Sequence, residues 1–348
     1  MLMLKTFCQF NEKPRALQNS RLFLLSESQP PLIFMATIHY LGPTGTFSEQ
    51  AAQMLGGDLL AMMPERTGGC SFVPQPMISR ILAAIDGPGT FAVVPYYNLL
   101  EGLIQETLDL IVEHDLEVLA ARQIPIRHAI GGFLPDDSKA DVPVFSHPKA
   151  LPQCSAFLET HFPAATHHET SSTSQAVHHV AEKRFGLAIA RRETFENMGV
   201  PVLHDDIGNR QYSRQNTTEF LLVGQKTTVV GEHKQQPNSH TRTLIAIMPV
   251  IDRVGLLADI LGQIAFFGIN LLKIHSRPAL TDAFGQAPQM FYIETDVAAD
   301  SPELRLCIET FDMWLAKRGG NDDLPRHVTD HKVVRVLGTY NLHLPENQ

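Results

Sequence analysis

Before residue 226, short apolar runs alternate with amphipathic segments. Strands are predicted where such a run lies between turn residues, at 37–41, 91–95, 142–145, 186–190 and 220–223. Residues 103–112 carry apolar side chains at helical spacing, and a helix is predicted to start at Thr46 because Thr46 and Glu49 fit a capping box. Strands that alternate with helices indicate a layered α/β fold.

A second pattern starts after a polar segment at 226–240, which is typical of a linker. The apolar spacing then predicts, in order, a strand at 243–248, a helix at 256–264, strands at 270–277 and 289–295, a helix at 304–315 and a strand at 333–337. This βαββαβ order is the ferredoxin-like arrangement. Residues 1–35 show no period, and we expect a disordered extension or a segment upstream of the true start codon.

The composition, with 44% hydrophobic and 19% charged residues, is that of an ordinary globular protein. The formal net charge is −9 and no run is rich in Lys or Arg, so nucleic acid is not an expected partner. No apolar run approaches the ~18 residues of a membrane span, so no membrane is expected either. The four cysteines are scattered without a CxxC pair, which argues against a disulfide framework and for a reducing cytoplasm.

Three predicted strand-to-helix junctions share one chemical feature, a hydroxyl beside free backbone amides. They are Gly42–Ser48, Ser146–Lys149 and Ser171–Ser174. The N-terminus of a helix offers unpaired N–H groups and a partial positive charge, which suit a carboxylate. Three such junctions could converge on a small dianion, although each could also be an ordinary N-cap. The candidate substrate-binding residues at the junctions are Thr44, Thr46, Ser48, Ser146, His147 and Ser172.

Two other kinds of site are disfavoured. Gly42 and Gly45 do not have the GxGxxG spacing of a dinucleotide site. The 16 histidines include the pairs His167-His168 and His178-His179, but not the i,i+4 spacing around a glutamate that zinc proteases use. We therefore predict no metal.

Four motifs resemble, in order, those of the prephenate dehydratase family. Gly42-Pro-Thr-Gly-Thr-Phe-Ser48 resembles the opening motif, and Ser146-His-Pro-Lys-Ala-Leu-Pro-Gln-Cys154 resembles the second signature. Asn270-Leu-Leu-Lys-Ile-His-Ser-Arg-Pro278 is similar to the regulatory motif, which ends in Glu-Ser-Arg-Pro. Val336-Leu-Gly-Thr-Tyr340 matches the closing strand. The chain is thus identified as a member of the family over about 38–340.

The resemblance implies two domains. Residues 36–225 would form a catalytic domain of two α/β lobes around a cleft, similar to periplasmic binding proteins, and residues 241–341 a regulatory ACT domain. The implied reaction converts prephenate to phenylpyruvate in phenylalanine biosynthesis, with loss of water and carbon dioxide and no cofactor. The implied partners are phenylalanine, bound at a subunit interface, and further copies of the chain in a cytoplasmic homodimer or homotetramer.

The resemblance also implies roles for individual residues. Thr218 corresponds to the threonine of the family's Thr-Arg-Phe motif and is the expected proton donor. Asn98 matches the asparagine of a Glu-Asn-Ser segment, and together with Asn216 it is expected to contact the substrate. His275 replaces the glutamate of the regulatory motif, so affinity for phenylalanine is an open point. The residues expected to bind the effector are Gly255, Leu256, Asn270, Ser276 and Arg277.

Three positions depart from the catalytic motifs. Glu219 replaces the arginine that is expected to hold a substrate carboxylate, and Tyr97 and Leu99 replace an acid and a hydroxyl residue. A carboxylate that faced the substrate would repel it, and Arg210 or Arg214 would then be the substitute anchor.

These departures, clustered at the expected cleft, favour altered chemistry or an altered ligand over random decay. Two alternatives to a dehydratase therefore stay open. One is a prephenate decarboxylase that does not aromatise the ring, and the other is an inactive homologue that senses an amino acid. Thr218 favours dehydration, whereas Glu219 favours a changed pose of the substrate.

Overall fold

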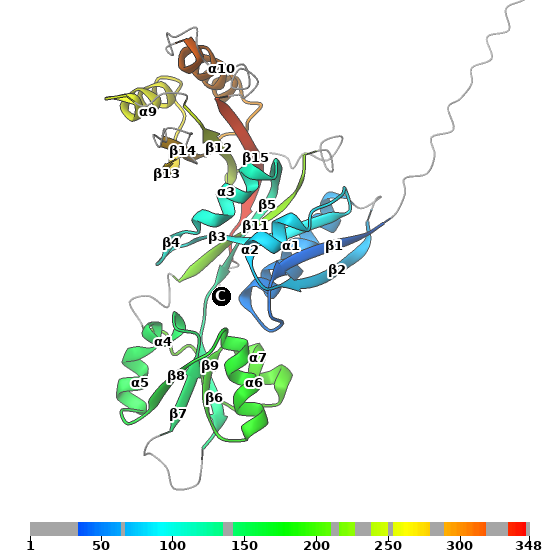
Figure 1. Ribbon diagram of the computed structural model, residues 1–348, viewed down its shortest axis with the longest axis vertical. Coiled ribbons are helices and arrows are strands. Elements are labelled where there is room, and N and C mark those ends of the chain that lie inside the picture. The colour runs from blue at the N-terminus through cyan, green and yellow to red at the C-terminus, as the bar shows by residue number, and fades with distance from the viewer. Residues whose placement is uncertain are drawn as a thin grey trace, which may run out of the picture. The chain divides into compact units, whose positions relative to one another are not determined.

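Two open sheets organise the part of the chain that the structure describes (Figure 1). The computed structural model describes residues 34–63, 67–134, 142–209, 216–226, 238–249, 253–278, 289–317 and 333–345. They belong to one compact unit, Ile33–Gln348. The expected extension at 1–35 and the expected linker at 226–240 lie mostly outside the described residues, although the first strand already begins at Phe34.

Lobe 1 uses the part of the larger sheet with the strand order β5-β11-β3-β1-β2. Its elements are β1 (Phe34–Leu41), α1 (Phe47–Met62), β2 (Thr67–Gln75), α2 (Ile78–Ala83), β3 (Thr90–Asn98), β4 (Gly102–Leu103), α3 (Gln105–Glu113), β5 (Leu116–Pro125) and β11 (Thr217–Gln225). Side chains on its strands alternate between two faces. Val94 and Leu221 pack in an apolar cluster with α2 and α3, whereas Val93 and Leu222 pack in a second cluster with α1.

Lobe 2 is a separate sheet with the order β10-β6-β9-β7-β8. Its elements are β6 (Ala129–Phe133), β7 (Pro143–Ser146), α4 (Ala150–Gln153), α5 (Ser155–His161), β8 (Thr166–Glu169), α6 (Thr173–Lys183), β9 (Gly186–Ala190), α7 (Arg192–Met198) and β10 (Val202–His204). Figure 1 shows α4 and α5 on one face of this sheet and α6 and α7 on the other. The alternation along β9 fits this, because Leu187 and Ile189 pack with α4 and α5, and Ala188 and Ala190 pack with α6 and α7.

The two lobes share one strand plan. In each, the first parallel strand, β1 or β7, lies between the second and the third, and an antiparallel strand follows the third. This antiparallel strand is β11 in lobe 1 and β6 in lobe 2. The chain therefore passes between the lobes twice, after β5 and again after β10, and the predicted two-lobed α/β fold is confirmed.

The C-terminal elements form the predicted βαββαβ unit. They are β12 (Thr241–Ile247), α9 (Leu256–Phe266), β13 (Leu271–Pro278), β14 (Gln289–Thr295), α10 (Pro302–Lys317) and β15 (Val334–His343). The order β13-β14-β12-β15 with antiparallel neighbours is ferredoxin-like. β15 also pairs with β5 at Leu342 and His343, which makes the unit continuous with the sheet of lobe 1. Gly338 permits this approach, since a Cβ there would lie 2.2 Å from the carbonyl oxygen of Val118.

The apolar runs predicted β1, β3, β7, β9 and β11. They did not lead to a prediction of β5 and β6, although both strands are mostly buried, and they missed β2 and β8, which have no such run. β2 contains two glycines and a proline, and β8 consists of four exposed polar residues. Pairing with a neighbouring strand forms both, because backbone hydrogen bonds do not depend on an apolar side chain.

Candidate functional site

The opening motif and the second signature lie at equivalent places in the two lobes. Ligands of open α/β sheets bind beyond the carboxyl ends of the strands, where the strand order reverses. In lobe 1 the order reverses at β1, which leads into Gly42–Thr46, and in lobe 2 it reverses at β7, which ends at Ser146. The fold therefore gives a physical reason to look for a site at both motifs.

The loop between β1 and α1 touches lobe 2 through its backbone. The hydroxyls of Ser174 and Thr194 donate to the carbonyl oxygens of Thr44 and Gly45 at 2.6 and 2.7 Å. Arg191, which directly follows β9, donates to the carbonyl oxygen of Thr46 at 3.2 Å. These bonds bring a cation and the starts of two helices, α1 and α6, to one place between the lobes.

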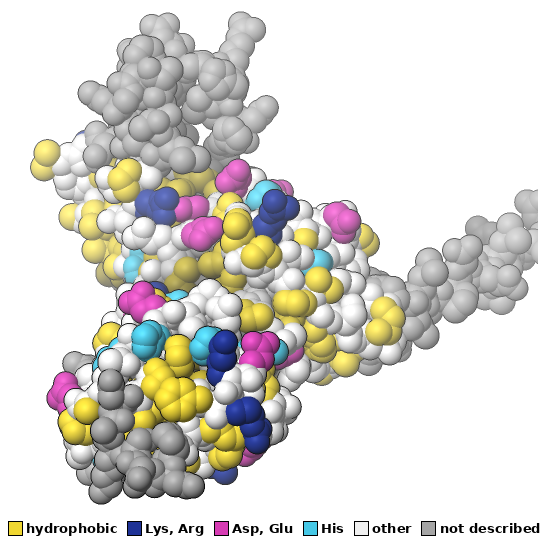
Figure 2. Space-filling view, turned by 60° about the horizontal axis from the view of Figure 1, so that its bottom comes forward, with side chains coloured by type: hydrophobic (Ala, Val, Ile, Leu, Met, Phe, Trp, Pro, Cys, Tyr) yellow, Lys and Arg dark blue, Asp and Glu magenta, His cyan; other side chains and the backbone are white. Residues whose placement is uncertain are grey.

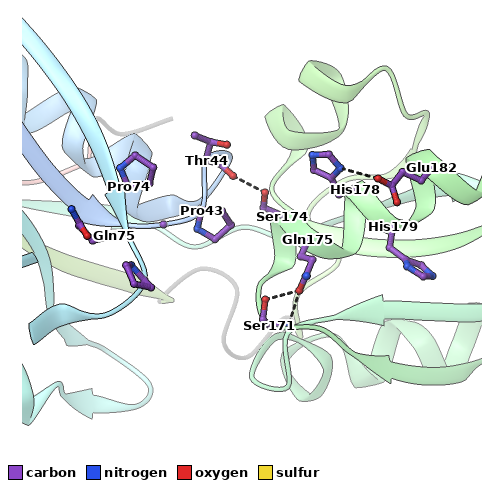
Figure 3. A pocket seen from close by; sticks show the side chains of 12 residues that line it. Pro43, Thr44, Pro74, Gln75, Ser171, Ser174, Gln175, His178, His179 and Glu182 are labelled. Atoms are coloured by element: carbon purple, nitrogen blue, oxygen red, sulfur yellow. Dashed lines mark hydrogen bonds and ion pairs between the residues drawn. The ribbon is translucent and has the colours of Figure 1, made fainter. Parts of the chain in front are cut away.

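A groove of about 840 Å³ lies beside these contacts and is called here the interlobe groove (Figure 3). It is lined by Gly42, Pro43, Thr44, Pro74, Gln75, Pro76, Ser171, Ser174, Gln175, His178, His179 and Glu182. Two of the three predicted junctions therefore share a cavity. The third, Ser146–Lys149, does not line it.

Both helices at the groove begin as predicted, and their hydroxyls are used in capping. Thr46 Oγ1 accepts from the N–H of Glu49 at 3.3 Å, and Ser172 Oγ accepts from the N–H of Gln175 at 3.1 Å. The carboxylate of Glu49 bonds the N–H of Gly45 at 2.6 Å rather than that of Thr46, so the box closes one residue earlier than expected. Thr44 is exposed in the groove, whereas Ser48 is buried in α1.

At the third junction, the first predicted binding residue has a structural role. Ser146 is fully buried, and its hydroxyl donates to the carbonyl oxygen of Ile189 at 2.8 Å, so it joins β7 to β9 instead of facing a ligand. His147 is half-buried, and burial together with Lys149 lowers its pKa. Lys149 reaches across to lobe 1 and pairs with Glu101 at 2.5 Å. The helix that follows has only four residues, so it offers little of the dipole that was expected.

The predicted proton donor Thr218 lies in a set of oriented hydrogen bonds at the neighbouring strands. Asn98 Nδ2 donates to Thr218 Oγ1 at 2.9 Å and to Asn216 Oδ1 at 3.1 Å. Asn98 Oδ1 accepts from the N–H groups of Leu100 and Glu101 at 2.9 and 3.0 Å, which fixes which end of the amide faces Thr218. The structure thus brings Thr218, Asn98 and Asn216 together.

Sequence reasoning missed two residues that extend this set. Gln153 Oε1 accepts from Asn216 Nδ2 at 3.0 Å, and His128 Nε2 lies 3.0 Å from the same oxygen. Gln153 lies inside the second signature and could have been found there, but nothing in the sequence singles out His128. We call Asn98, Asn216, Gln153 and His128 the amide chain.

Thr218 and the β1 loop belong to one edge of the sheet. β11 and β1 are separated only by β3, but Thr218 pairs with Asn98 whereas the last pair of β1 with β3 is Tyr40 with Val93, so Thr218 lies further out along this edge and does not line the interlobe groove. A cation that sequence reasoning also missed, Arg191, stands at the facing edge of lobe 2. A basic residue directly after a predicted parallel strand was the available signal for it.

Two departures from the family motifs do not face the cleft, contrary to the expectation from the sequence. Glu219 follows Thr218 on β11 and points to the opposite face of the sheet, where Lys273 of β13 lies 2.9 Å from its Oε2. Tyr97 precedes Asn98 on β3 and packs 6.1 Å from the ring of His275 on β13. The predicted repulsion between Glu219 and the substrate is therefore wrong for this chain. Leu99 is exposed in the turn after β3.

Lys273 joins two carboxylates beneath two aromatic rings. Its Nζ is 2.9 Å from Glu294 Oε2 as well, and 4.9 Å from the ring centres of Tyr96 and Tyr97. Burial opposes the charge of Lys273, but the two carboxylates outweigh burial and raise the pKa of the ammonium group. Burial, reinforced by Glu294, raises the pKa of Glu219. The lysine thus carries the charge that stabilises this cluster.

The expected effector residues fall into two groups within one chain. Asn270 precedes β13 and bonds Asp296 at 3.0 Å, whereas Ser276 and Arg277 lie at its other end, about 20 Å away at ~3.3 Å per residue. Arg277 forms an ion pair with Asp109 of α3. Gly255 caps α9 with φ at 83°, and Leu256 is buried in the core of the unit. The structure therefore does not bring all five together in a single copy.

Other candidates contribute no further site among the described residues. No group of three or more His, Cys, Asp or Glu that could hold a metal occurs in these ranges, and the candidate anchors Arg210 and Arg214 lie outside them. No helix in the described part is long and apolar enough to cross a membrane. On the face shown in Figure 2, Lys and Arg side chains lie among acidic ones.

The fold and these facing loops define a two-lobed α/β protein with a polar site between its lobes and a βαββαβ unit behind it. The prephenate dehydratase family model matches residues 38–228, so the chain belongs to the prephenate dehydratase family. It is 32% identical over 248 residues to the prephenate dehydratase of Amycolatopsis methanolica, across 70% of this chain and 74% of that relative.

Two further comparisons describe the extent of the similarity. The chain is 28% identical over 259 residues to the bifunctional chorismate mutase/prephenate dehydratase of Pseudomonas aeruginosa, across 74% of this chain but 64% of that relative. It thus spans slightly less than two thirds of this relative. The solved prephenate dehydratase of Arthrobacter aurescens in complex with L-Phe has the same fold, with a TM-score of 0.70, 24% identity and coverage of 88% of this chain and 90% of that one.

Proposed function

We propose that this chain is a prephenate dehydratase, which converts prephenate to phenylpyruvate with loss of water and carbon dioxide. The observation that carries the proposal is the orientation of Thr218. Its Oγ1 accepts a hydrogen bond from Asn98, whose amide is itself fixed by two backbone N–H groups. The hydroxyl hydrogen of Thr218 is therefore left to be donated elsewhere.

Dehydration needs such a donor. The ring hydroxyl of prephenate leaves as water only when it is protonated, while the carboxylate across the ring leaves as carbon dioxide and the ring becomes aromatic. A positioned general acid supplies about 10²–10⁴-fold in rate. In our proposal Thr218 donates this proton, and Asn98 holds its oxygen in place.

The substrate is a dianion, so its carboxylates need donors in a protein with a net charge of −9. We propose that the free N–H groups at the starts of α1 and α6 and the guanidinium of Arg191 supply them. The amide nitrogen of Gln153 is another donor, since its oxygen is engaged by Asn216 and His128. Thr44, Thr46, His147 and Ser172 remain predicted binding residues, of which Thr44 is the most exposed, whereas the buried side chains of Ser48 and Ser146 do not face the substrate in this proposal.

The placement of Glu219 and Tyr97 favours dehydration over a decarboxylation that leaves the ring intact. Both side chains lie on the face of the sheet away from Thr218, where β13 covers them. Altered residues on that face do not change what the Thr218 hydroxyl contacts. The contacts of these two departures with β13 therefore support a role in packing against the βαββαβ unit rather than a new reaction.

A product assay on prephenate tests the proposal. We expect phenylpyruvate from the parent protein and a loss of about 10²–10⁴-fold in kcat for Thr218→Val, which keeps the shape and removes the hydroxyl. Thr218→Ser, which retains the hydroxyl, is the matched control and should keep most of the activity. Carbon dioxide released without an aromatic product would support the decarboxylase instead, and an active Thr218→Val protein would remove Thr218 as the acid.

We further propose that residues 36–225 are the catalytic domain and residues 241–341 an ACT domain that binds phenylalanine. The two groups of effector residues are about 20 Å apart in one chain, so one amino acid meets both only between two copies. This supports a homodimer or homotetramer. Phenylalanine should raise the melting temperature and lower activity, and a monomer in solution with phenylalanine bound would contradict the shared site.

We place the reaction in the cytoplasm. Cys70, Cys154 and Cys307 are free thiols among the described residues, which fits a reducing compartment.

A further inference from the structure

His128 lies where the two connections between the lobes meet. Its carbonyl oxygen accepts from the N–H of Ile207 at 2.9 Å, and Ile126, two residues earlier, donates to the carbonyl oxygen of Asn216 at 2.8 Å. The amide chain therefore runs through four different parts of the molecule. Asn98 belongs to lobe 1, Gln153 to lobe 2, His128 to the first connection and Asn216 to the second.

The direction of every hydrogen bond in the amide chain follows from its first member. Asn98 donates to Asn216 Oδ1, so the nitrogen of the Asn216 amide is the end that faces Gln153. Because Asn216 Nδ2 is a donor, the Gln153 atom between them is the oxygen. His128 Nε2 meets the same oxygen, so Nε2 must carry the hydrogen.

This assignment leaves His128 Nδ1 as an acceptor. It is buried from solvent and has no hydrogen-bond partner among the described residues, and the side chain as a whole is 4% exposed. A ring this enclosed does not touch a substrate directly. Its ring meets the residues around it through the hydrogen bond to Gln153 Oε1 and through an edge-to-face contact with Phe47, whose ring centre lies 6.0 Å away.

We propose that His128 is a positioning residue, which fixes the amide of Gln153 so that its nitrogen is presented as a donor to the substrate. The proposal rests on the prephenate dehydratase activity proposed above. Without His128, only Asn216 would donate a hydrogen bond to the Gln153 oxygen, and an amide held at one point rotates easily. With His128 Nε2–H on the other side, the oxygen is held between two donors, and among the described residues the Gln153 nitrogen has no other partner.

The two ends of the amide chain have different effects on kinetics. The Asn98 end stays oriented by the N–H groups of Leu100 and Glu101, so Thr218 keeps its geometry when His128 is changed. Only the Gln153 end is loosened. Loss of His128 should therefore raise KM for prephenate more than it lowers kcat.

Two variants test this. His128→Leu removes the donor at similar volume, and we expect KM to rise roughly 10-fold with kcat within about 3-fold, since one misplaced binding contact costs about that much. His128→Gln carries an amide nitrogen the same number of bonds from Cα as Nε2, and should restore KM to within about 3-fold of the parent. His128→Leu should melt close to the parent, because it also removes the unpartnered Nδ1.

An unchanged KM in a folded His128→Leu protein would overturn the proposal, as would equal losses in both variants. A second measurement does not depend on activity. Long-range ¹⁵N–¹H spectra of the parent should show His128 with its proton on Nε2, and a proton on Nδ1 would also overturn it. A parent protein that makes no phenylpyruvate would instead refute the proposed function, and the tautomer would still decide the direction of the hydrogen bonds.

Discussion

Replacement of Lys273 by methionine should destabilise this protein far more than the loss of an exposed ion pair. Lys273 Nζ lies 2.9 Å from Glu219 Oε2 and from Glu294 Oε2, and those side chains are 2% and 1% exposed. Methionine keeps the length of the side chain and removes its charge, which leaves the buried carboxylate of Glu219 without a paired cation, whereas Glu294 keeps Arg242, whose Nε lies 3.6 Å from Glu294 Oε1. Removal of one partner from a buried pair costs about 3–5 kcal/mol, and we expect a loss of unfolding free energy in that range.

The chain offers a matched control. Lys149 also forms an ion pair, at 2.5 Å from Glu101, but its side chain is 67% exposed. Water already solvates such a charge, so Lys149→Met should cost about 0–1 kcal/mol. The contrast between the two lysines separates the effect of burial from the effect of losing an ion pair.

The assay is urea unfolding at pH 7, monitored by circular dichroism. It compares the parent, the two single variants and the double variant Lys273→Met with Glu219→Gln. The second substitution removes the uncompensated charge of Glu219 and should recover roughly 1–3 kcal/mol, because a neutral amide costs less to bury than a carboxylate. Equal losses for Lys273→Met and Lys149→Met, or no recovery in the double variant, would refute the reasoning that Lys273 stabilises a buried cluster between β13 and β11.

Two further predictions concern the contact between the lobes and the response to acid. Gly45 has φ at +79°, and a Cβ there would lie 3.0 Å from Ser174 Oγ, so Gly45→Ala should cost about 1–3 kcal/mol and raise KM for prephenate. Gly57→Ala in α1, where a Cβ would meet nothing within 4 Å, should be neutral or stabilising, and a similar loss in both would contradict the argument. Burial lowers the pKa of four histidines in the folded protein below the ordinary value of 6.5. As the pH falls, the unfolded chain therefore takes up protons before the folded protein does. The unfolding free energy should decrease below about pH 6.5, by up to about 1.4 kcal/mol per pH unit for each group. Melting temperatures at pH 7.5, 6.5 and 5.5 check this, and a flat or rising trend toward acid would contradict it. These histidines are His39, His128, His147 and His275.

Local patterns were sufficient for much of the architecture. An apolar run at 186–190 indicates a strand wherever it lies in the fold, and Thr46 and Ser172 cap helices because a hydroxyl at that position satisfies a free N–H of the same segment. The βαββαβ order followed from the same kind of signal. These features depend on neighbours within a few residues, which the sequence displays directly.

The candidate site was only partly accessible in this way. Motif resemblance predicted Thr218 and Asn98, and the 2.9 Å bond between them joins residues 120 positions apart. Strand alternation alone indicates that Glu219 and Thr218 face opposite sides, a signal that the motif comparison overrode. What covers the side of Glu219 could not be inferred, because Lys273 lies 54 positions further along the chain.

The sequence by itself thus determined several of the strands, the starts of the capped helices and the identity of a retained hydroxyl, since each follows from short-range chemistry. Only the tertiary structure decided that β13 supplies the cation for Glu219 and that His128 and Gln153 meet at one oxygen. Such partners come from different lobes, and their contact depends on how the sheets are joined. The arrangement of the two sheets depends on the whole chain, because the chain leaves lobe 1 after β5 to form lobe 2 and returns with β11 to complete lobe 1.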